Sequence, residues 1–110
     1  MTETEFLSIA GRVLDDVEAA FERAGDAADV DVECSRSGNV LEIEFIDNGS
    51  KIIVNTQAPM QEIWVAARAG GFHYRLIDGR WLDTRDGSEL YATLSRLASA
   101  QAGAPLALTP

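Results

Sequence analysis

The sequence predicts an α+β fold: a two-layer sandwich in which an antiparallel six-stranded sheet carries the N- and C-terminal helices on one face. Three observations predict it. A long amphipathic segment opens the chain, six short segments of alternating apolar residues follow across tight turns, and a second amphipathic segment comes last. Each strand has one apolar face, and the two helices are the available cover. Residues 1–110 are expected to form one domain, with 103–110 as a C-terminal tail.

The first helix is expected over residues 3–24, where apolar side chains recur at the i, i+3, i+4 spacing of one helical stripe. Gly25 is expected to end it in the left-handed conformation. The second helix is expected to start at a capping box made by Asp86 and Glu89 and to end at about Gln101. The stripe of the first helix consists of Phe6, Ile9, Ala10, Val13, Val17, Ala20, Phe21 and Ala24.

The hairpin over residues 40–56 is the strongest local signal in the chain. Asn48-Gly49 suits a two-residue type I′ turn, in which both central residues have a positive φ. That turn pairs Phe45 with Ile52 and places Trp64, on the next strand, on the outer and wetter face of the sheet. The other strands are expected over residues 29–34, 61–67, 72–77 and 80–83.

The charge of the chain is concentrated in its first third. The net charge is −9, and residues 1–33 hold ten acids but only two bases, Arg12 and Arg23. Such a field repels nucleic acid and anionic membranes and attracts cations or a basic protein. The alternative interpretation, that the acidic surface only aids solubility, stays open at this point.

The sequence contains few of the residues that known catalytic arrangements require. Cys34 is the single cysteine, which excludes an internal disulfide and a cysteine-rich metal site and indicates a reduced, cytoplasmic protein. The acidic N-terminus is not expected to be a signal peptide. His73 is the single histidine, and we expect it to be a plain surface residue, while Tyr74 and Trp81 belong to the core.

Two surfaces remain as candidate sites. An acidic ridge on the first helix and the adjoining strand offers carboxylates, the ligands of hard cations, although exposed carboxylates on a rigid helix should bind weakly. Its alternative is a solvated helix face. The ridge consists of Asp15, Glu18, Glu22, Asp29, Asp31 and Glu33.

The second surface is the open face of the sheet. An aromatic side chain among adaptable amides is typical of a protein-binding hot spot. The alternative is an indole that lies on its own sheet with its N–H group in water. The residues expected there are Glu42, Glu44, Ile53, Asn55, Gln57, Trp64 and His73.

The segment NGSKIIVNTQAPMQEIWVA, followed by GGFHY, resembles the frataxin family and specifically its bacterial branch. The resemblance implies a role in iron–sulfur cluster assembly, weak binding of iron (Fe²⁺ or Fe³⁺) on the acidic ridge, and contact with the cysteine desulfurase and scaffold protein of that pathway. It implies acidic ridge positions at Glu18, Glu22, Asp29, Asp31 and Glu33. It implies partner-binding positions at Glu18, Glu22, Asn55, Gln57 and Trp64.

This chain departs from the family pattern in several places. Ala19, Arg23 and Gly25 stand where bacterial relatives often carry acids, and Leu7 stands where some carry a histidine. Two functions therefore remain open. One is a monomeric, non-enzymatic protein that regulates or supplies iron to cluster assembly. The other is an iron chaperone or store with ferroxidase-like activity.

Overall fold

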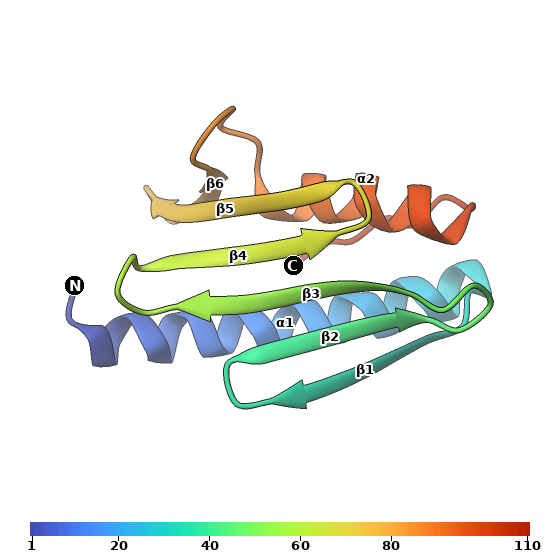
Figure 1. The fold of residues 1–110 in the computed structure, drawn as a ribbon, viewed down its shortest axis with the longest axis horizontal. Coiled ribbons are helices and arrows are strands. Elements are labelled where there is room, and N and C mark those ends of the chain that lie inside the picture. Colours follow the sequence, from blue (N-terminus) through green and yellow to red (C-terminus); the bar gives the residue numbers. More distant parts are fainter.

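The computed structural model describes all residues, 1–110, and has the predicted order of helix, six strands and helix (Figure 1). The sheet is antiparallel, and its strands lie side by side in chain order. The fold class expected from the sequence is confirmed. The elements are α1 (Glu3–Ala28), β1 (Val32–Ser37), β2 (Val40–Phe45), β3 (Ser50–Gln57), β4 (Glu62–Ala67), β5 (Gly70–Ile77), β6 (Arg80–Asp83) and α2 (Leu90–Ala102).

Both helices lie on the same side of the sheet, and the other side is open (Figure 1). α1 packs across β1, β2 and β3, whereas α2 packs at the β6 end. Because side chains alternate along a strand, the buried inner face fixes which residues point outward. No helix is long and apolar enough to cross a membrane.

The core is one apolar cluster between the helices and the inner face of the sheet. Edge-to-face ring pairs join α1 to β6 and to β2: Phe6 with Trp81 at 6.2 Å and Phe21 with Phe45 at 6.4 Å between ring centres. Tyr74 and Trp81 are buried as predicted. The buried stripe of α1 also contains Leu14, which the periodicity argument omitted.

The β2–β3 hairpin has the predicted faces but a different register. Phe45 pairs with Ser50, two residues away from the expected Ile52. Of the turn residues, Gly49 has a positive φ of 71° and Asn48 does not, so the turn is not type I′. The loop has four residues instead, and the Asn48 side chain closes it by accepting a hydrogen bond from the Ser50 N–H and donating one to a carbonyl of α2.

The first helix runs one turn longer than predicted. Gly25 lies buried within α1, and Asp29 takes the left-handed cap with a φ of 55°. A Cβ at Gly25 would lie 2.8 Å from the Val30 carbonyl oxygen and 3.0 Å from a methyl group of Val32. Glycine therefore serves here to let the chain return closely beneath the helix, and β1 starts at Val32, later than predicted.

The second helix is capped by Glu89, so the expectation that Asp86 is the cap was wrong. The Glu89 carboxylate accepts hydrogen bonds from the first free N–H groups of α2, while Asp86 closes the preceding loop. Gly103 ends the helix in the left-handed conformation with a φ of 69°. The tail then turns back against α2 and buries Leu106 and Leu108.

Two glycine substitutions in α1 should shift stability in opposite directions. We expect Gly25→Ala to lower the free energy of unfolding by about 1–3 kcal/mol, because the added Cβ meets backbone. Gly11→Ala should raise it by about 0.5–1 kcal/mol, because the added Cβ meets only the end of the Arg36 side chain, at 4.0 Å. Urea unfolding of both variants measures this. Equal effects of the two substitutions would contradict the packing argument.

Candidate functional site

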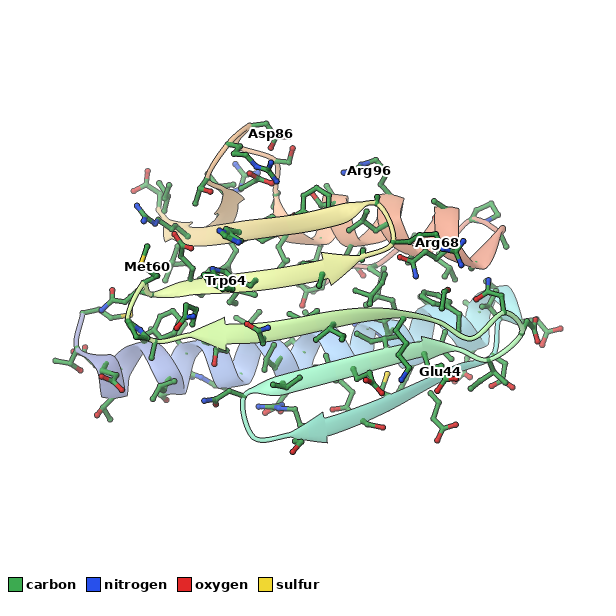
Figure 2. All side chains as sticks on the ribbon, in the orientation of Figure 1. Glu44, Met60, Trp64, Arg68, Asp86 and Arg96 are labelled. Atoms are coloured by element: carbon green, nitrogen blue, oxygen red, sulfur yellow. The ribbon has the colours of Figure 1, made fainter.

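The open face of the sheet carries an aromatic pair at its centre. In the register, Asn55 of β3, Trp64 of β4 and His73 of β5 form one row across three strands. The Trp64 and His73 rings are parallel, with an interplanar angle of 9° and ring centres 4.3 Å apart. Figure 2 shows Trp64 on the exposed side of β4. The indole is half-buried by this stack, so it is less exposed than the sequence indicates.

Glu62 contacts both rings of the aromatic pair and holds the indole in place. It precedes Trp64 by two residues and so shares its face, yet its side chain is only 4% exposed. Its Oε1 accepts a hydrogen bond from the Trp64 Nε1–H at 2.8 Å, and its Oε2 accepts one from the Arg75 Nε–H at 2.7 Å. His73 Nδ1 lies 3.6 Å from Oε1. These contacts fix the indole plane in one orientation.

The ionisation of Glu62 follows from these contacts. Burial acts to raise the pKa of this carboxyl, but the hydrogen bonds from Trp64 and Arg75, with the positive charges nearby, outweigh burial and lower the pKa below its ordinary value. Glu62 is therefore a charged group held under the indole. One part of the alternative is confirmed, because the indole lies on its own sheet against His73, and the other part is wrong, because its N–H donates to Glu62 and not to water.

The amides beside this pair have no partners within the protein. The side chains of Asn55 and Gln57 make no internal hydrogen bond, and both are half-buried on the open face. Each offers a donor and an acceptor next to a fixed aromatic ring. This combination can bind another protein, because the ring is already ordered and the amides adapt to either polarity.

The ridge carboxylates on α1 lie along the side of the helix near β1. Asp15 forms an ion pair with Arg36 of β1 and is therefore partly neutralised. Burial, together with the nearby carboxylates of Glu18 and Glu22, raises the pKa of the Cys34 thiol to about 11. Cys34 is thus a poor nucleophile. Because both carboxylates act on Cys34 of β1, Glu18 and Glu22 lie close to the α1–β1 edge.

The other ridge carboxylates, Asp29, Asp31 and Glu33, lie in two other places. Asp29, as the α1 cap, and Asp31 line a shallow hollow together with Asp26, which the sequence argument did not include. Glu33 pairs in register with Glu44 on the open face of the sheet, because its neighbours in β1 pack against the core. No three acidic, histidine or cysteine side chains converge as metal ligands.

Comparison with known proteins identifies the class. The family model described as "Frataxin-like domain" matches residues 1–104. The chain belongs to the frataxin family, as the sequence resemblance indicated. It is 62% identical over 108 residues to the iron–sulfur cluster assembly protein CyaY of Janthinobacterium sp. (strain Marseille), covering 98% of this chain and 96% of the relative. It is 65% identical over 106 residues to the protein of the same name from Cupriavidus taiwanensis, covering 96% and 95%.

Solved structures agree with this assignment. Frataxin from Psychromonas ingrahamii superimposes with a TM-score of 0.87 at 31% identity, covering all of both chains. Trimeric frataxin from the yeast Saccharomyces cerevisiae, crystallised in a complex with ferrous iron, superimposes with a TM-score of 0.72 at 25% identity and covers 86% of this chain and 85% of its own. Both of the bacterial relatives described above carry the name CyaY.

Two side chains of this aromatic network were not predicted from the sequence. Glu62 and Arg75 were not singled out, although Glu62 stands two residues before Trp64 in an alternating strand and Arg75 stands two after His73. The signal that could have found them is the β4–β5 register, which places Glu62 directly opposite Arg75. An acid, a base and two rings on one face predict an internal network.

Glu62→Gln should change the pH dependence of stability. The folded-state pKa of Glu62 lies below its ordinary value of 4.5, so the carboxylate stabilises the fold fully above pH 4.5, and this stabilisation is lost as the pH falls through the folded-state pKa. We expect the free energy of unfolding to fall less steeply in the variant than in the wild type as acid is added. The Trp64 indole N–H signal should move, while that of Trp81 stays as an internal control. Identical acid profiles would contradict the network.

Proposed function

We propose that the protein acts in cytoplasmic iron–sulfur cluster assembly as a monomeric, non-enzymatic regulator that binds the cysteine desulfurase and its scaffold protein. The observation that carries the proposal is the fixed Trp64 indole with the unpaired amides of Asn55 and Gln57 beside it. The names of the two bacterial relatives, both iron–sulfur cluster assembly proteins, support the pathway. The open face is the contact surface in this proposal, and Trp64 is its anchor.

The acidic ridge supplies a second, longer-range contribution. Glu18 and Glu22 have no ion-pair partner within the protein, in contrast to Asp15. Free carboxylates on an exposed helix attract a basic patch and speed association more than they strengthen the final complex. We therefore assign Glu18 and Glu22 to the approach of the desulfurase and Trp64 to the bound state.

In this proposal the protein binds iron weakly at the ridge, either to deliver it or to respond to it. The absence of a converging ligand set supports fast exchange, as does the ion pair that occupies Asp15. The alternative, an iron chaperone or store with ferroxidase-like activity, is favoured by one observation, the ferrous complex of the yeast relative. Oxidation of ferrous iron faster than in buffer alone would support the alternative.

Binding kinetics separate the two surfaces. Glu18→Lys with Glu22→Lys should slow association with the desulfurase and flatten its salt dependence, whereas Asp16→Lys with Asp47→Lys, of equal charge change, should have less effect. Trp64→Ala should speed dissociation from the desulfurase–scaffold complex, with a loss of about 1–3 kcal/mol.

The controls for Trp64→Ala follow from its contacts. Because the indole N–H is bonded to Glu62, we expect this variant to lose some stability as well, so melting curves and Trp64→Phe, which keeps a stacking ring, accompany it. Ile77→Ala removes an exposed apolar side chain from the same face. Equal weakening by Ile77→Ala and Trp64→Ala would refute the anchor role. An unaltered association rate in the double ridge variant would refute steering.

Cation binding should follow the free ridge carboxylates. We expect manganous ion to broaden amide signals near Glu18, Glu22 and Asp31 first, with fast exchange and with loss of binding at moderate salt. Glu18→Gln with Glu22→Gln should shift the remaining broadening to the hollow at the end of α1. A single tight site, for instance at His73, would contradict weak ridge binding.

A further inference from the structure

A basic cleft lies between the β4–β5 turn and α2, apart from both surfaces described above. Its volume is about 160 Å³, and it is lined by Arg68 and Ala69 of the turn and by Arg96, Leu97, Ala100 and Gln101 of α2. No carboxylate lines it, whereas the neighbouring hollow that contains Arg85 also contains Asp83 and Asp86. Figure 2 shows Arg68 and Arg96 on this side of the molecule, above the position of Glu44.

The backbone of Arg68 and the side chain of Arg96 each make one contact beside the cleft, and neither contact is an ion pair. The backbone N–H of Arg68 donates to Gln101 Oε1 at 3.0 Å, and Gln101 is itself buried and bonded to the β2–β3 hairpin. The Arg96 guanidinium lies 5.9 Å from the centre of the Phe72 ring. Neither side chain takes part in any ion pair of the protein. Two exposed guanidinium groups that form no ion pair thus line one cleft in a chain of net charge −9.

Apart from Gln101, the rest of the cleft wall is apolar. Leu97 is buried and Ala100 is exposed beside it, so the floor can accept an aliphatic side chain. Since the whole protein repels anions at long range, a ligand here must be held by short-range contacts, both charged and apolar. The C-terminal tail of this chain does not supply the ligand, because Arg23 holds the Thr109 carbonyl at 3.1 Å elsewhere.

We propose that this cleft docks a segment of a protein partner in which an aliphatic side chain lies next to acidic ones. Arg68 and Arg96 bind the carboxylates through charge-assisted hydrogen bonds, and Leu97 and Ala100 cover the aliphatic group. The surface is separate from the open sheet face and from the ridge. This surface is positively charged, whereas the ridge is negatively charged, so it binds an acidic part of a partner.

The test is an NMR titration of the full chain with the acetylated tripeptide amide Leu-Glu-Glu. We expect shifts at Ala69, Leu97 and Ala100 with affinity in the millimolar range, and at least fivefold weaker binding by Arg68→Gln with Arg96→Gln. Arg12→Gln with Arg80→Gln removes the same charge from exposed arginines outside the cleft and should bind as the wild type does. Melting curves establish that each variant is folded.

Three outcomes would overturn the proposal. The first is absence of shifts in the cleft at peptide concentrations of tens of millimolar. The second is equal binding of the peptides Leu-Gln-Gln or Ala-Glu-Glu, or of inorganic phosphate, since the carboxylates or the leucine would then contribute nothing. The third is a change of the same cleft signals on dilution of the protein alone, which would identify a second copy of the chain as the occupant. None of these outcomes involves the desulfurase, so they leave the proposed function untouched.

Discussion

The burial of the α1 stripe against the inner face of the sheet is the constraint on which the rest of the structure depends. Once Ile43, Val54 and Tyr74 are fully buried beneath the helices, strand alternation forces their neighbours outward. The outer face receives no helix, so its polar and aromatic side chains must satisfy one another or remain free. Glu62 is hydrogen-bonded to its neighbours on this face, whereas the Asn55 amide remains free. The candidate surface is thus a direct consequence of one-sided packing.

The fold class, the six strands and the faces were predictable because they depend on period and composition alone. The hairpin register was wrong by two residues, yet the faces stayed correct, since an even shift preserves them. The errors lie at element ends, where tertiary contacts decide. The Asn48 side chain bonds to a carbonyl of α2, and the chain at Val30 passes so close to α1 that residue 25 must be glycine. Neither contact has a local sequence signal.

The candidate sites were predictable to the extent that they follow single elements. Trp64 was placed on the correct face by alternation, but its bonds to Glu62 and its stack on His73 depend on the pairing of β4 with β5. The acidic ridge was assembled from helix angles and strand parity in isolation. Because Val32 and Cys34 of β1 face the core below α1, Glu33 lies on the opposite side of the sheet from Glu18.

The separation of the ridge from Trp64 decides how the two surfaces can act. β1, beside the ridge, and β4, which carries Trp64, are three strand spacings apart, or about 14 Å. Screening in physiological salt decays over about 8 Å, so the ridge charges contribute little to contacts made at Trp64. The field of the ridge instead extends outward from the β1 edge. In the proposed function a basic partner is first attracted there, and contact at Trp64 follows as a short-range step that orients the partner relative to the sheet.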